Sequence, residues 1–170
     1  MRGQATKRVA ILGGLRTPFC RSYTKYSHVS NQEMMTAVLI EIVKKYKLKN
    51  QKLDDVSLGA VIKHSKDFNL ARESLLSSGL SPKTPAFDIQ RACGTSITAA
   101  IVIASKISSG IIKSGIAGGV DSISDLPIVY PDAFRNILLS SFSGRKLIDR
   151  ILPWLKLRPR HLKPSLPSVD

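Results

Sequence analysis

A chain of 170 residues, 43% of them hydrophobic, can form one globular domain with a real core, but it is short for two full domains. Its net charge of +14 favours acidic partners: nucleic acid, an anionic membrane surface or phosphate-bearing small molecules. Two cysteines are too few for a disulfide framework and no secretory signal is visible, so we expect a cytoplasmic protein, the alternative being a mitochondrial one whose presequence is missing.

The first fifty residues predict a strand, a loop and a helix. Residues 8–14, RVAILGG, form a short apolar run that ends in two glycines, which is typical of a buried strand. Residues 15–29 are rich in Pro, Ser, Thr and charged side chains and predict a loop. In residues 30–50 apolar side chains recur about every 3.6 residues, and Ser30 and Glu33 have the spacing of a capping box. This spacing predicts a helix.

The alternation of strand and helix then continues. Strands are predicted at residues 56–62, 85–90 and 114–120. Helices are predicted at residues 69–79, with Asn69 as the candidate cap, and at residues 94–110. The helix at 94–110 is apolar around nearly its whole circumference, so we expect it to be buried. The alternation predicts an α/β fold, with a mostly parallel sheet and helices on both faces. Ligands of such folds bind at the carboxyl ends of the strands.

The character of the sequence changes after Ser124. From Ser141 onward there are seven Lys and Arg against two Asp, and prolines become frequent. The stretch ILPWLKLRPR mixes apolar and basic residues, as segments that lie on a membrane surface do. We interpret this region as a basic, partly helical insertion. Because aromatic residues make up only 6% of the chain and no nucleic-acid-binding motif occurs, nucleic acid is not the expected partner.

Cys93 lies between a predicted strand and a predicted helix. A cysteine just before a helix meets free backbone N–H groups and the positive end of the helix dipole, and both favour the thiolate. A thiolate there can attack a carbonyl carbon, while the N–H groups help to hold the developing oxyanion. The alternative is a small buried hydrophobic residue, as free cysteines often are.

Five segments of the chain resemble one known family, in the family's order. They are RVAILGGLRTPF, GAVIKHSKDFNLARE, RACGTS, SGIAGGVDSISDLPI and LKLRPRHLKPSLPSVD. They are similar to segments of the thiolase family, and most of all to its long-chain 3-ketoacyl-CoA thiolase branch, the β-subunit of fatty-acid-oxidation trifunctional complexes. The resemblance covers nearly all of residues 8–170 but only the N-terminal part of a thiolase.

The resemblance implies a division of the chain and a reaction. Residues 1–127 would be an incomplete thiolase-like half-domain that lacks its last strand, and residues 128–170 the start of the inserted basic loop domain. The family's reaction is the thiolytic cleavage of 3-ketoacyl-CoA to acetyl-CoA and a shortened acyl-CoA in fatty-acid β-oxidation. Coenzyme A would be a co-substrate, with no permanently bound cofactor and no metal.

The resemblance also implies roles for individual residues. Cys93 would be the nucleophile that takes the acyl group as a thioester. The small residues after it would contact the substrate: Gly94, Thr95 and Ser96. Two structural glycines would follow the fourth strand, where Gly permits backbone conformations that other residues resist: Gly118 and Gly119.

Other groups of a thiolase site have no match in this sequence. The family uses a second cysteine as acid and base, a histidine that activates the nucleophile, and an Asn or His at the oxyanion, all in its second half. Cys20 does not match the second cysteine, and we expect it to be a bystander. The histidines are expected to be solvated loop residues: His28, His64 and His161. We therefore expect that the chain alone does not turn over.

The resemblance suggests partners and leaves alternatives open. Acyl-CoA, CoA and either a second copy of the chain or a trifunctional α-subunit are the expected partners, and the basic tail would contact a membrane surface. A first alternative is a non-catalytic thiolase fragment that serves as a dimerisation partner. A second is a β-ketoacyl synthase-like condensing enzyme, which shares the strand–Cys–helix junction.

Overall fold

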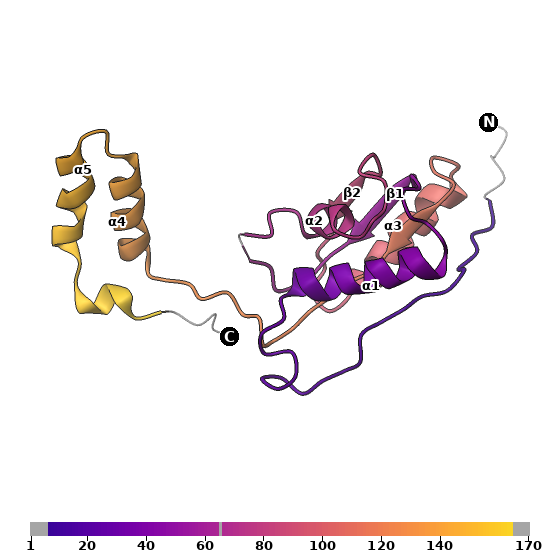
Figure 1. Cartoon of the computed structure of the whole chain (residues 1–170), viewed down its shortest axis with the longest axis horizontal. Coiled ribbons are helices and arrows are strands. Elements are labelled where there is room, and N and C mark those ends of the chain that lie inside the picture. Colours follow the sequence, from indigo (N-terminus) through magenta and orange to yellow (C-terminus); the bar gives the residue numbers. More distant parts are fainter. Residues whose placement is uncertain (1–6, 65, 165–170) are drawn as a thin grey trace. The chain divides into compact units, whose positions relative to one another are not determined.

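The computed structural model describes residues 7–64 and 66–164. The chain divides into two compact units, Met1–Leu126 and Pro127–Asp170. Among the described residues, the first unit holds three helices and three strands, and the second holds two helices with two short 3₁₀ turns (Figure 1).

Helix α1 (Asn31–Lys45) begins as its sequence predicts. The Ser30 side chain accepts a hydrogen bond from the Glu33 N–H, and the Glu33 carboxylate accepts one from the Ser30 N–H at 2.8 Å. Both halves of the capping box are therefore present. The bond from the Ser30 backbone, followed by one that the Ser30 hydroxyl donates to the same carboxylate, holds the pKa of Glu33 below its usual value of 4.5. Helix α2 (Leu70–Leu76) is capped by Asn69, also as predicted.

The three strands form one parallel sheet in the order β2-β1-β3. Strand β1 (Asp55–Leu58) is central, with β2 (Ala86–Asp88) on one side and β3 (Gly115–Ala117) on the other. Val56 lies opposite Ala86 in one neighbour and Ile116 in the other. The carboxyl ends of all three strands therefore meet at one edge of the sheet.

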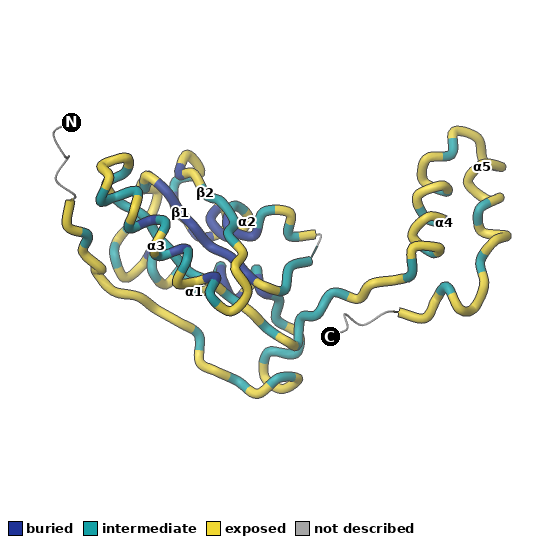
Figure 2. Tube along the Cα trace, turned by 180° about the vertical axis from the view of Figure 1, so that it is seen from behind, coloured by how far each residue is buried: buried dark blue, intermediate teal, exposed yellow. Residues whose placement is uncertain are grey.

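Helices cover both faces of the sheet, which confirms the predicted α/β class. Side chains of β1 alternate: Val56 and Leu58 join a core with residues of α1 and α2, whereas the Asp55 carboxylate pairs with Lys106 of helix α3 (Thr95–Ser108). Strand β1 is buried along its whole length and forms the dark-blue centre of this unit in Figure 2.

Two expectations about apolar segments are wrong. Residues 8–14 form no strand, and Ile11 and Leu12 are 92% and 84% exposed. A strand needs a neighbour to pair with, and this segment makes isolated hydrogen bonds instead, such as the one its Leu12 carbonyl accepts from the Tyr46 hydroxyl at 3.2 Å. Helix α3 buries one face only, because its opposite face, with Ile97 62% exposed, packs on nothing that the structure describes.

The second unit is a helical hairpin. Helix α4 (Asp132–Ser143) packs against α5 (Leu147–Ile151) and against a 3₁₀ turn (Leu152–Lys156), and a further 3₁₀ turn spans Pro159–Leu162. The Ser141 hydroxyl links α4 to α5 and to the first 3₁₀ turn. It donates a hydrogen bond to the Arg150 carbonyl at 2.7 Å and accepts one from the Trp154 indole at 2.9 Å. Among the described residues, no helix is long and apolar enough to cross a membrane.

Candidate active site

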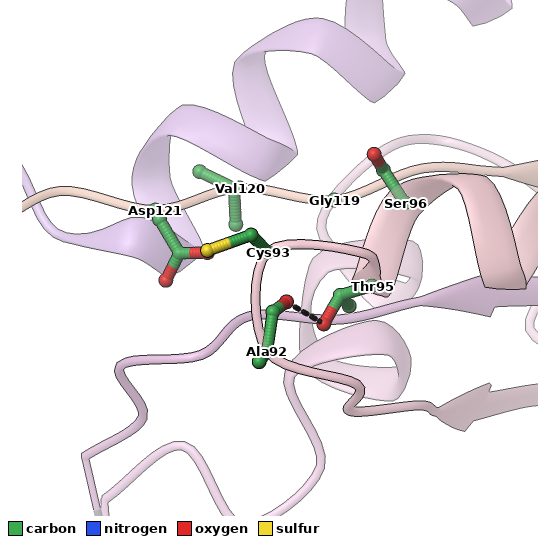
Figure 3. A pocket seen from close by; sticks show the side chains of 7 residues that line it. All are labelled: Ala92, Cys93, Thr95, Ser96, Gly119, Val120 and Asp121. Carbon is green, nitrogen blue, oxygen red and sulfur yellow. Dashed lines mark hydrogen bonds between the residues drawn. The ribbon is translucent and has the colours of Figure 1, made fainter.

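A small hollow lies at the carboxyl ends of β2 and β3, where the fold predicts a ligand site. Its volume is about 160 Å³, and it is lined by residues of the two loops that follow these strands and of the first turn of α3 (Figure 3): Ala92, Cys93, Thr95, Ser96, Gly119, Val120 and Asp121. The parallel pairing of both strands with β1 brings the two loops together.

Cys93 is exposed and stands directly before Gly94, the N-cap of α3. It is therefore not the small buried hydrophobic residue of the alternative interpretation. Gly94 contributes no side-chain oxygen to the first turn, so the positive end of the helix is not occupied by a capping side chain. In Figure 3 the sulfur is turned toward the Val120–Asp121 segment across the hollow.

A strained backbone elbow presents the thiol. Ala92 has a φ of 43°, in the left-handed region that costs a residue with a side chain about 1–2 kcal/mol. Two short turns close the elbow: the Gly94 N–H donates to the Arg91 carbonyl at 2.9 Å, and the Thr95 N–H donates to the Ala92 carbonyl at 3.1 Å. The chain therefore bends sharply between β2 and α3, and Cys93 lies at the outside of the bend.

The residues expected to contact substrate differ in their surroundings. Ser96 is exposed and lines the hollow, whereas Thr95 is only 3% exposed and its hydroxyl is bonded to backbone groups of the elbow. Gly94 is half-buried beside them. Their contact with a substrate stays a prediction.

Gly118 and Gly119 follow β3 as predicted, but the expected reason for glycine is wrong. Neither has a positive φ, so an unusual backbone conformation does not require glycine at these positions. Close approach explains Gly119, because a Cβ there would lie 2.9 Å from the Ser96 Cβ. At Gly118 an added Cβ would meet only the flexible end of Leu58, at 3.2 Å.

Asp121 is a residue of the hollow that sequence reasoning missed. One carboxylate oxygen accepts hydrogen bonds from the N–H groups of Val61 and Ile62, both at 2.9 Å. It thereby fixes the loop after β1 against the loop after β3. The only available signal was an acidic side chain directly after a predicted strand.

His64 lies in the loop after β1 but is not the solvated residue we expected. Its Nε2 lies 2.9 Å from the side chain of Asp125, whose other oxygen accepts a hydrogen bond from the Asn31 N–H at 3.0 Å. The His64 side chain is 22% exposed, which makes this a partly buried pair. It connects the start of α1 to the chain that follows β3.

Cys20 and His28 lie apart from the hollow. Cys20 is half-buried near Tyr26, and burial, followed by hydrogen bonding to the Cys20 thiol, raises the pKa of Tyr26. His28 does not line the hollow, and His161 belongs to the second unit. No group of three His, Cys, Asp or Glu side chains that could hold a metal is found in residues 7–64 and 66–164.

Comparisons with known proteins agree with this architecture. The family model described as "Thiolase, N-terminal domain" matches residues 9–152. The chain is 35% identical to a 3-ketoacyl-CoA thiolase of Photorhabdus laumondii over 166 residues, which are 98% of this chain and 38% of the relative. A 3-ketoacyl-CoA thiolase of Erwinia tasmaniensis is 35% identical over 163 residues, 96% of this chain and 37% of the relative.

A solved structure shows the same fold. The crystal structure of the Bacillus anthracis acetyl-CoA acetyltransferase matches with a TM-score of 0.57 and 22% sequence identity, over 71% of this chain and 39% of that one. The chain thus spans less than two-fifths of the length of these proteins. The family match decides between the two families that the sequence suggested: this chain belongs to the thiolase family and matches its N-terminal domain.

Proposed function

We propose that the chain contributes the nucleophile to an acyltransferase of the thiolase type, with Cys93 as the residue that carries the acyl group. The observation that carries this proposal is the placement of an exposed thiol at the start of α3, in a hollow at the carboxyl ends of parallel strands. Family membership supports it.

The proposed reaction is the thiolytic cleavage of a 3-ketoacyl-CoA. The Cys93 thiolate attacks the 3-keto carbon, the bond between carbons 2 and 3 breaks, and acetyl-CoA leaves after its carbanion takes a proton. The thiol of a second CoA then attacks the Cys93 thioester, releases the shortened acyl-CoA and returns free Cys93. CoA is a co-substrate in this scheme, and the scheme needs no metal.

These 170 residues supply only part of such a site. The proton transfers at carbon 2 and at the nucleophile need groups that the sequence does not match. We therefore propose that the chain on its own forms the Cys93 thioester slowly and does not complete turnover. The alternative, a non-catalytic thiolase segment that pairs with another chain, predicts no thioester.

Domains, partners and location complete the proposal. Residues 1–127 would act as the thiolase half-domain and residues 128–170 as the start of its loop domain, whose basic side chains would attract CoA phosphates. A second copy or a trifunctional α-subunit would be the protein partner, in the cytoplasm. The exposed apolar and basic side chains of the α4–α5 hairpin favour contact with an anionic membrane surface.

Thioester exchange tests the proposal without the missing groups. An acyl-CoA transfers its acyl group to Cys93 and releases CoA, with no bond to carbon 2 broken. Incubation of the protein with an acyl-CoA, followed by peptide mass spectrometry, should find one acyl group on Cys93, none in Cys93→Ser, and an unchanged amount in Cys20→Ser. Equal acylation of Cys20 and Cys93, or none on either, would overturn the proposal.

A further inference from the structure

The side chain of Thr95 bonds to the backbone on both sides of the strained elbow. Its hydroxyl accepts a hydrogen bond from the Arg91 N–H at 2.9 Å. It also donates one to the Ala92 carbonyl at 2.7 Å, which is the dashed line in Figure 3. The side chain is shielded from water, since Thr95 is 3% exposed. Both hydroxyl bonds therefore form in a site where solvent cannot replace them.

The elbow depends on such bonds because Ala92 is held in an unfavourable backbone conformation. A residue with a side chain keeps a left-handed φ, here 43°, only when the surrounding structure imposes it. No hydrogen bond to the Cys93 thiol is found in the part of the chain that the structure describes. The backbone of the elbow thus decides where the Cys93 side chain starts, with no hydrogen bond from the described residues to hold the sulfur.

We propose that Thr95 is a positioning residue for Cys93: its hydroxyl fixes the left-handed elbow at Ala92 and thereby aims the thiol into the hollow. The inference rests on the proposed function for the chemistry of Cys93, but the geometry it invokes is independent of any substrate. It assigns the Thr95 hydroxyl to the backbone rather than to a substrate.

The shape of Thr95 allows its hydroxyl to be removed without leaving a void. Its methyl group packs toward Gly59, where an added Cβ would lie 2.7 Å from the Thr95 Cγ2. Thr95→Val keeps this methyl and loses both hydroxyl bonds, whereas Thr95→Ser keeps the hydroxyl. Thr84 is a matched control elsewhere in the unit, because it is fully buried and its hydroxyl accepts the Leu53 N–H at 3.1 Å.

The experiment compares two thiols of the folded 170-residue protein. Iodoacetamide is applied at fixed pH, and peptide mass spectrometry gives the alkylation rate of Cys93 relative to that of Cys20. Loss of the two bonds should lower this ratio about fivefold in Thr95→Val. Thr95→Ser should restore the ratio to near the wild-type value, and Thr84→Val should leave it unchanged although it also loses a buried hydrogen bond.

Acylation by an acyl-CoA, measured on the same variants, separates this inference from the proposed function. If wild-type Cys93 accepts no acyl group but Thr95→Val still lowers the alkylation ratio, the function fails and the positioning role stands. If Thr95→Val matches the wild type in both assays, or Thr84→Val lowers the ratio as much, the positioning role is overturned.

A second pair of variants covers the case in which circular dichroism shows that Thr95→Val does not fold. Ala92→Gly relaxes the left-handed backbone, since glycine adopts positive φ without a steric penalty. Ala92→Gly/Thr95→Val should then show the same direction of loss relative to Ala92→Gly alone. An unchanged ratio between these two proteins would overturn the inference.

Discussion

Lys106 of α3 and Asp55 of β1 form an ion pair across one face of the sheet, with Nζ and Oδ2 2.5 Å apart. The Asp55 side chain is 8% exposed and that of Lys106 is 34% exposed. The lysine also lies over the ring of Phe87 in β2, 4.6 Å from its centroid. The pair therefore ties α3 to both the central strand and one edge strand.

Removal of the charge on Lys106 should destabilise the first unit, Met1–Leu126. Lys106→Met keeps contact with the Phe87 ring but leaves the Asp55 carboxylate without its cation, at a cost on the order of 2 kcal/mol in the free energy of unfolding. Asp55→Asn/Lys106→Met should recover part of this loss. Urea unfolding of Lys106→Met, Asp55→Asn and the double variant checks the prediction. A double variant that loses the full sum of the two single effects would contradict it.

The two glycines after β3 should respond differently to alanine. Gly119→Ala places a Cβ against Ser96 at the start of α3 and should cost about 1–3 kcal/mol while it slows alkylation of Cys93, because the added methyl lies in the hollow. Gly118→Ala is the matched control, since its Cβ meets only a flexible leucine end. Equal effects of the two variants on stability and alkylation would show that close approach is not the reason for Gly119.

Asp54 should make the stability of the fold depend on acid pH. Its carboxylate accepts hydrogen bonds from the N–H groups of Lys113 and Ser114, at 2.7 and 3.1 Å. The bond from Lys113 is the main cause that holds the pKa of Asp54 below its usual value of 3.8; burial opposes it, and Ser114 adds to it. Because the pKa is lower in the folded state, the contribution is fully present above pH 3.8 and is lost as the pH falls through the folded-state pKa.

Asp54→Asn should therefore be less stable than the wild type at neutral pH, and the difference should shrink in acid. Thermal unfolding between neutral pH and pH 3 measures it. Asp132→Asn is the control, because its carboxyl group is 87% exposed and should change stability little. A difference for Asp54→Asn that stays constant over this pH range would contradict the assignment.

The α4–α5 hairpin should bind anionic vesicles through its exposed apolar side chains. Phe142 of α4 and Leu155 of the 3₁₀ turn that follows α5 are 82% and 79% exposed, among basic side chains. Phe142→Ser/Leu155→Ser should weaken cosedimentation with phosphatidylserine vesicles roughly tenfold. Phe68→Ser, which removes a 94% exposed side chain of the other unit, is the control. Equal sedimentation of the wild type with phosphatidylcholine vesicles would refute an electrostatic contribution.

Local signals in the sequence predicted much of the fold. The capping box of Ser30 and Glu33, the Asn69 cap and the position of Cys93 before a helix each depend on neighbours a few residues away, and each is confirmed. The apolar run at residues 8–14 is just as typical of a strand in its own sequence. It has, however, no pairing partner that the structure describes. Strand formation depends on a neighbour, which hydrophobicity alone does not reveal.

The details of the site could not be read from the sequence for a related reason. Asp121 and Thr95 act through hydrogen bonds to the backbone, and such bonds leave no periodic pattern in a sequence. The left-handed conformation of Ala92 is also invisible, because alanine is not a residue type that signals a positive φ. These features depend on the contacts that form when folding brings together the loops after the three strands.

The strand order has a consequence for synthesis on the ribosome. Strand β1 is made first but occupies the centre of the sheet, and the loop that follows it is held by Asp121, 60 residues further along the chain. At roughly 5–20 residues per second, that carboxylate is added about 3–12 s after Val61. Until β2 is made, β1 has unpaired backbone N–H and C=O groups on both flanks, and until β3 is made it has them on one flank. Slower translation past Leu58 would lengthen the time for which this central strand has an open edge.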